Sequence, residues 1–127
     1  MMQRLLWVCL AGAVGTGTRY LLALWAGQRF DTTFPVATLI VNVVGCFLIA
    51  TVIQISLQVS GFSPDLRVIL TTGFMGGLTT YSAFNYETTN LWLSGARRMA
   101  LLNFGLTTVG CLVSGVLGLL LVRKLLG

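Results

Sequence analysis

Charged residues in this chain are confined almost entirely to the ends of four long apolar segments. Its 127 residues include 8 Lys and Arg and 3 Asp and Glu, and 56% are hydrophobic. Roughly a quarter of an ordinary soluble domain is charged, whereas this chain is 9% charged. A soluble fold of this size could not bury so much apolar surface, so lipid is the expected solvent, in which each helix needs about 20 apolar residues. The sequence predicts an all-α membrane protein, with one four-helix transmembrane domain over residues 1–127.

Polar and turn-forming residues separate these four helices. Their expected ranges are residues 4–27, 35–59, 65–94 and 99–122. Pro35 suits the first turn of the second helix, where its missing N–H costs little, and Ser63-Pro64-Asp65 is expected to cap and open the third. The N-terminal run also resembles a signal peptide, but its hydrophobicity continues beyond Arg19. We interpret it as a retained first helix.

Basic residues are divided almost evenly between the two ends of the predicted bundle. An even number of helices places both termini on one side. That side has four basic residues and the other has three: Arg4, Arg67, Arg123 and Lys124 against Arg29, Arg97 and Arg98. Because an excess of Lys and Arg in cytoplasmic loops sets orientation, this balance predicts insertion both ways round and an antiparallel, dual-topology homodimer. The alternative is that so small a difference carries no information.

Several function classes lack the residues they need. The chain has no His and 3 Cys, and the cysteines form no CxxC pair, so zinc ligation and a disulfide framework are not expected. The basic residues are scattered and do not form a phosphate-tracking surface, so no nucleic-acid partner is expected. Without His or paired carboxylates, catalysis has no support, and we predict that the chain is not an enzyme.

A break is predicted inside the third helix. Residues 71–82 hold three glycines and five Thr or Ser, which are poor helix formers. Non-helical backbone at membrane depth is tolerated only inside protein or beside a watery cavity. There the freed carbonyls can hold a cation and the new helix N-terminus can face an anion, which indicates a transport site. The alternative is that Gly76-Gly77 serves close helix packing.

Polar and aromatic side chains surround this predicted break. Tyr81 and Phe84 share a helix face, and the positive edges of their rings can face an anion, although aromatic pairs in membrane helices also simply pack. Thr38 and Asn42 form a polar stripe on the second helix with Gly45. A second stripe on the fourth helix consists of Asn103, Thr107, Cys111, Ser114 and Gly118. Together the two stripes outline a narrow polar path.

Two charges lie inside the predicted helices. A carboxylate such as Glu87 is costly in a spanning segment and tends to mark a pathway, but Glu87 can equally lie near the interface. Arg19 is deep in the first helix. It either extends to the interface or pairs with a carbonyl or carboxylate, and we favour pairing.

These residues resemble the Fluc (CrcB) family of fluoride channels over essentially the whole chain. The stretches that carry the resemblance are Gly12-Ala13-Val14-Gly15, Arg19-Tyr20, Pro35 with Thr38–Gly45, and Thr72–Phe84 followed by Glu87. The GFMGGLTT stretch within the third helix is the most specific of them.

The resemblance implies an antiparallel homodimer in the bacterial inner membrane that exports fluoride passively, excludes chloride and so reduces fluoride toxicity. It implies two pores per dimer and a central structural Na⁺ at the dimer interface, held by the main-chain carbonyls of Gly76 and Thr79. The implied pore residues are Asn42, Tyr81, Phe84, Ser82, Thr38, Glu87 and Cys111, with Arg19 as a structural polar residue. The implied partners are fluoride, a second copy of the chain and the lipid bilayer.

Three positions depart from the family pattern: Tyr81 replaces a Phe, Ala83 replaces a Thr, and Cys111 stands where Ser is common. These changes bear on conduction more than on fold. The main alternative function is a small dual-topology multidrug or cation antiporter, which resembles this chain in length. Such antiporters use a membrane-embedded Glu in the first helix, where this chain has no carboxylate and has Arg19. A structural subunit without transport fits the broken helix poorly.

Overall fold

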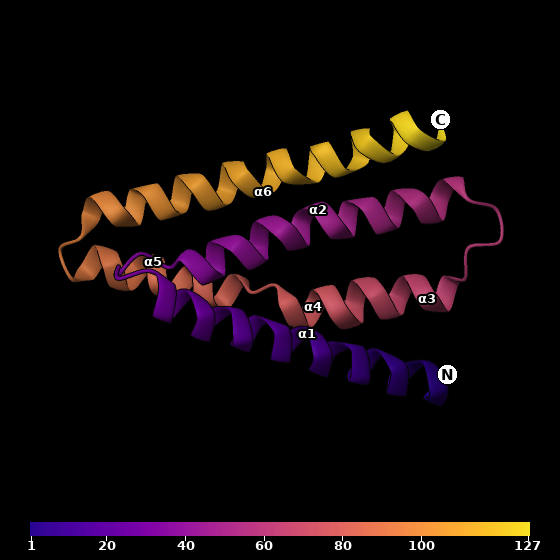
Figure 1. Ribbon diagram of the computed structural model, residues 1–127, viewed down its shortest axis with the longest axis horizontal. Coiled ribbons are helices and arrows are strands. Elements are labelled where there is room, and N and C mark those ends of the chain that lie inside the picture. Colours follow the sequence, from indigo (N-terminus) through magenta and orange to yellow (C-terminus); the bar gives the residue numbers. More distant parts are fainter.

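Helical segments form four rods, each running opposite to the one before it (Figure 1). The structure, a computed structural model, describes all residues from 1 to 127. The segments are α1 (Met2–Arg29), α2 (Val36–Gln58), α3 (Pro64–Val68), the π-helix η1 (Ile69–Met75), α4 (Gly76–Leu78), α5 (Tyr81–Leu93) and α6 (Arg97–Leu126). Segments α3, η1, α4 and α5 make up the third rod, and the prediction of an all-α chain is confirmed.

Three of the rods are single helices that are long and apolar enough to cross a membrane. Over their most apolar 18-residue windows, α1, α2 and α6 have mean hydropathies of 1.3, 2.5 and 2.1. The third rod is divided by the predicted break. Relative to the expected ranges, α1 and α6 are longer at both ends, and α2 begins at Val36 because Pro35 precedes its first turn.

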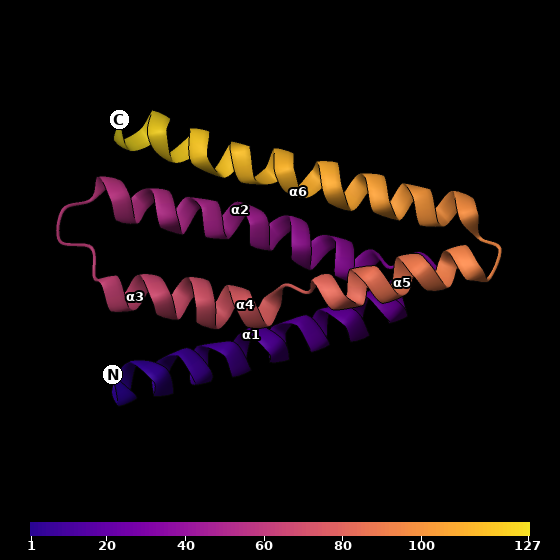
Figure 2. The ribbon, with the colours of Figure 1, turned by 180° about the vertical axis from the view of Figure 1, so that it is seen from behind.

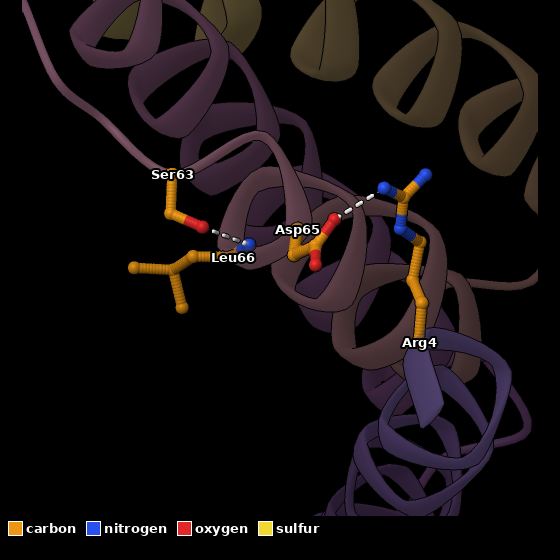
Figure 3. A network of polar contacts seen from close by, with 4 residues as sticks. All are labelled: Arg4, Ser63, Asp65 and Leu66. Carbon is orange, nitrogen blue, oxygen red and sulfur yellow. Dashed lines mark hydrogen bonds and ion pairs between the residues drawn. The ribbon is translucent and has the colours of Figure 1, made fainter. Parts of the chain in front are cut away.

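The start of the third rod follows the expected capping pattern. The Leu66 N–H donates to Ser63 Oγ at 3.3 Å, and Pro64 occupies the first helical position, where no donor is needed. Beside this cap, the Asp65 carboxylate accepts from the Arg4 guanidinium at 2.5 Å (Figure 3). This exposed ion pair joins the start of α1 to the start of α3.

The break in the third rod is much shorter than the Gly-rich stretch that predicted it. Only Thr79 and Thr80 have extended backbone, with ψ of 158° and 112°, and Figure 1 shows this link between α4 and α5 midway along the rod. The preceding glycines lie in η1 and α4. Glycine therefore does not interrupt the helix here; the predicted break is present, but it is confined to the two threonines that follow.

The glycines instead let two backbones touch. A Cβ on Gly15 of α1 would overlap the carbonyl oxygen of Phe74, and one on Gly77 of α4 would overlap the carbonyl oxygen of Gly12. Small residues allow this approach between membrane helices. Close helix packing thus explains Gly77, whereas the break in the helix is formed by Thr79 and Thr80.

Little of the chain is buried within itself. Only 16 of 127 residues are buried, and the outer faces of α1 and α6 expose many large apolar side chains, as expected for a protein surrounded by lipid. Rods α2 and α6 run in the same direction and pack together, whereas α1 packs on η1 and α4. Both termini lie at the same end of the bundle, as the view from behind also shows (Figure 2).

Candidate functional site

The extended link is held in place by one side chain of α2. Asn42 Nδ2 donates to the Thr80 carbonyl at 3.0 Å, and the Thr80 N–H donates to Asn42 Oδ1 at 2.8 Å. The side-chain amide thus pairs with the backbone N–H and C=O of Thr80, as the backbone of a neighbouring strand would. Asn42 is only 8% exposed, so these bonds are shielded from competing donors. One of its two Nδ2 hydrogens remains free for another acceptor.

This arrangement deprives several carbonyl groups of their helical donors, including those of the predicted site residues Gly76 and Thr79. The Gly76 carbonyl would ordinarily accept from the Thr80 N–H, which bonds to Asn42 instead. The Thr79 carbonyl loses its partner in the same way, because the Ala83 N–H donates to Thr80 Oγ1, the N-cap of α5, at 3.1 Å. The carbonyls of Gly76 and Thr79 therefore lie within one turn of each other without their usual helical donors.

A cavity of about 490 Å³ lies beside the link, between α2, η1, α5 and α6. Six of the predicted site residues line it together: Asn42, Gly76, Thr79, Tyr81, Phe84 and Cys111. Gly76 and Tyr81 are exposed, so the cavity reaches the outer surface of the single chain. The free N–H of Asn42, the released carbonyls and the aromatic rings thus belong to one site.

The two aromatic rings have different environments. Phe84 is 6% exposed and stacks at 6.5 Å on Phe104 of α6, while Tyr81 is 79% exposed. The centroids of the Tyr81 and Phe84 rings are 5.6 Å apart, and their planes meet at 64°, which is an edge-on contact. Phe84 is therefore fixed within the chain, whereas the Tyr81 ring is held mainly by this contact.

Thr38 and Glu87 lie apart from this cavity. Thr38 Oγ1 donates to Glu87 Oε1 at 2.8 Å, and the other oxygen, Oε2, is buried without a hydrogen-bond partner. Both residues line a second cavity of about 200 Å³ between α1, α2 and α5. Ser82 lines neither cavity; it is exposed, with Oγ 3.3 Å from Thr80 Oγ1. The structure therefore divides the predicted pore residues between two cavities, apart from Ser82.

The polar stripe of α6 splits into two parts. Thr107 donates to Asn103, which donates to Thr88 Oγ1 of α5 at 2.8 Å, while Ser114 Oγ donates to the Val43 carbonyl of α2 at 2.7 Å. The bonds of Asn103 to Thr88 and of Ser114 to Val43 join α6 to α5 and to α2. Thr107 and Cys111 also line the larger cavity, so the middle of the stripe faces the break, as expected.

Sequence reasoning did not single out Cys46 or Met75, which also line the larger cavity. The spacing of four between Asn42 and Cys46 placed both on one face of α2 and was the signal that could have found Cys46. Nothing in the local sequence marks Met75, because its position depends on the π-helical turn of η1.

Arg19 of α1 pairs with a carbonyl of the third rod. Its Nε donates to the Gly77 oxygen at 3.1 Å, and Thr16 Oγ1 lies 3.5 Å from the same oxygen. Arg19 therefore pairs with a carbonyl, as we favoured, and does not extend to the interface.

The carbonyl oxygens freed at the break are possible ligands for a hard cation. No group of three or more His, Cys, Asp or Glu residues is arranged to hold a metal ion. Unwound backbone carbonyls in membrane helices coordinate Na⁺, and the freed carbonyls of Gly76 and Thr79 have that chemistry. These donors fit a hard monovalent cation.

The sequence is similar to those of several known proteins. The family model described as CrcB-like protein, camphor resistance (CrcB), matches residues 6–119. A protein of Anaeromyxobacter sp. (strain K), named fluoride-specific ion channel FluC, is 51% identical over 126 residues, which are 99% of this chain and 100% of the relative. One from Sorangium cellulosum (strain So ce56), with the same name, is 46% identical over 98% of both chains. A third, from Citrifermentans bemidjiense, is 40% identical over 98% of this chain and 100% of the relative.

These similarities confirm two predictions. The relatives are named as ion channels, and this chain is not an enzyme. Its three long apolar helices and its relatives make it a multi-pass protein of the inner membrane. The fluoride-specific ion channels named above are similar to this chain along nearly their whole length. The chain belongs to the CrcB-like family.

Proposed function

We propose that this chain is a fluoride-selective channel that lets fluoride leave the cell passively and so lowers its toxicity. The proposal rests chiefly on the cavity that joins Asn42, Phe84 and Tyr81 at the break, in a chain 51% identical to a protein named fluoride-specific ion channel. A conducting site must bind its ion well enough to admit it and weakly enough to release it. One amide N–H and two positive ring edges are weak ligands of this kind.

The proposed channel is an antiparallel, dual-topology homodimer. Gly76 and Tyr81, beside the extended link, are exposed on the single chain, yet freed backbone groups are not tolerated against lipid. A second copy would cover them. Because both termini lie at one end, basic residues remain balanced between the two ends of the bundle, which supports insertion in either orientation.

A two-fold axis would give such a dimer two equivalent pores, because each subunit brings one cavity. We place Asn42, Tyr81, Phe84 and Cys111 along the central part of each pore. Ser82 and the Thr38–Glu87 pair would continue it as polar positions nearer the end of the bundle that carries the α1–α2 loop. Arg19 would serve structurally, holding the Gly77 carbonyl.

We further propose that the carbonyls of Gly76 and Thr79 hold a structural Na⁺ at the dimer interface. A single chain supplies two oxygens, and oxygen-ligated metal ions usually have more. The two-fold partner would supply the same two. Binding there would satisfy the carbonyls that Asn42 and Thr80 leave free.

Ion efflux from liposomes tests the main proposal. Vesicles loaded with potassium fluoride and carrying the purified chain are treated with valinomycin, and an electrode measures the fluoride that emerges. We expect rapid fluoride release without a proton gradient and no chloride release from matched vesicles. Absence of fluoride flux would overturn the channel, and flux only with an imposed proton gradient would favour antiport.

Orientation and Na⁺ need separate measurements. A cysteine introduced by Gly127→Cys should be labelled from outside by an impermeant reagent in about half of the chains if topology is dual, with the unsubstituted chain as background. Full or zero labelling would contradict dual topology.

Replacing Na⁺ by N-methylglucamine during purification should lower fluoride flux, and unchanged flux would argue against the Na⁺ site.

A further inference from the structure

Three sulfur-bearing side chains line the larger cavity, each from a different element. Cys46 belongs to α2, Met75 to η1 and Cys111 to α6. Both cysteines are free, and they line the same cavity from two different helices. Met75 is only 5% exposed, so its thioether is directed into the protein interior rather than into lipid.

The helices that carry the two thiols pack tightly against each other close to these residues. Ser114 Oγ of α6 donates to the Val43 carbonyl of α2 at 2.7 Å. A Cβ on Gly115 would lie 3.8 Å from the Cys46 carbonyl oxygen, and one on Gly118 would collide with that of Phe47. The thiols are therefore held in place by the packing of α2 on α6, and little ordering is needed to bring them to a shared ligand.

Soft sulfur ligands select soft metal ions. The cavity offers two thiols and a thioether, but no carboxylate or imidazole lines it, so hard divalent ions find no complete set of ligands. Two thiolates give a divalent soft ion a neutral complex. Neutrality matters because the cavity wall is mainly apolar, with Ile49 and Leu112 among its lining residues, and an unbalanced charge in such surroundings is costly.

We propose that Cys46 and Cys111, assisted by Met75, form a binding site for a soft, thiophilic metal ion such as Hg²⁺. Each thiol releases its proton to water, and each sulfur lone pair forms one bond to the metal. Hg²⁺ and two S–H groups thus become a neutral S–Hg–S unit and two protons, without any change of oxidation state. The Met75 sulfur adds a third, weaker contact.

Occupancy of this site would close the ion path. The same cavity holds Asn42 and Phe84, so a bound metal would stand beside the groups assigned to fluoride. This consequence rests on the proposed channel function, whereas the metal site itself does not. Binding and block are therefore measured separately.

Thiol counting tests the site without any transport measurement. The chain has three cysteines, and the purified protein should react at all three with dithiodipyridine. After one equivalent of Hg²⁺ we expect a single reactive thiol, that of exposed Cys9, and an intact mass raised by one mercury less two protons. Loss of only one thiol per metal, or unchanged reactivity, would overturn the site.

Serine variants then identify the ligands. Cys46→Ser and Cys111→Ser should each weaken Hg²⁺ binding at least about tenfold, which corresponds to about 1.4 kcal/mol, whereas Cys9→Ser should bind as the unsubstituted chain does. Equal binding in all three variants would refute the assignment. In liposomes, block of fluoride efflux should follow the same order. If Hg²⁺ binds but fluoride efflux continues, the metal site stands and only the proposed closure of the ion path is wrong. If no fluoride flux is seen before Hg²⁺ is added, the channel function is contradicted.

Discussion

Replacing Asn42 by Leu should destabilise the chain through the backbone of Thr80. Asn42 bonds to both backbone polar groups of Thr80, at 3.0 and 2.8 Å, and is 8% exposed. Leu has similar volume, keeps water out and can make neither bond. A buried backbone group left unpaired costs about 1–3 kcal/mol, so two such groups set a lower limit of about 2 kcal/mol, or roughly 30-fold in the unfolding equilibrium.

Unfolding in mixed micelles measures this loss directly. Circular dichroism followed against the mole fraction of dodecyl sulfate should show a clearly lower midpoint for Asn42→Leu. Asn90→Leu is the matched control, because Asn90 is exposed on α5 and its side chain makes no hydrogen bond within the chain; its midpoint should be unchanged or higher. If Asn42→Leu unfolds like the unsubstituted chain, Asn42 does not hold the link, and a role limited to ion contact would replace the one argued from geometry.

Three further substitutions have defined outcomes. Tyr81→Phe should preserve or raise fluoride efflux from liposomes, because the exposed ring loses only a hydroxyl without a hydrogen-bond partner; a clear fall would contradict its placement in the pore. Gly77→Ala should lower the thermal midpoint, since its Cβ would overlap α1, whereas Gly17→Ala, with open space around it, should not; equal midpoints would count against the close packing. Asp65→Asn should change stability by less than about 1 kcal/mol, because its pair with Arg4 is about half exposed, and a larger loss in chemical unfolding would show that the pair matters more than its exposure implies.

Much of the architecture could be predicted from the spacing of charges and turn residues. Pro35 and Ser63-Pro64-Asp65 mark two helix starts because their effects are local: a fixed φ, a missing donor and a side-chain cap. The assembly of Asn42, Tyr81 and Phe84 around one cavity also follows from a polar stripe facing a predicted break.

The length of the break could not be read in this way. Glycine lowers helix propensity locally, but tertiary contact decides the outcome, and at Gly77 the absent Cβ is used to bring α4 onto α1. The residues that do leave the helix, Thr79 and Thr80, do so because Asn42, 38 residues away from Thr80, takes over its hydrogen bonds. A pairing between distant segments is not contained in local propensity.

The long helices of this chain also set a requirement on bilayer thickness. The 23 residues of α2 span about 35 Å, and residues 99–122 of α6 span about 36 Å, against a hydrocarbon core of about 30 Å. The surplus must be absorbed by tilt or by local thickening. Lipids with longer acyl chains should therefore suit this protein better than short ones, and acyl-chain length becomes a variable to hold constant whenever variants are compared.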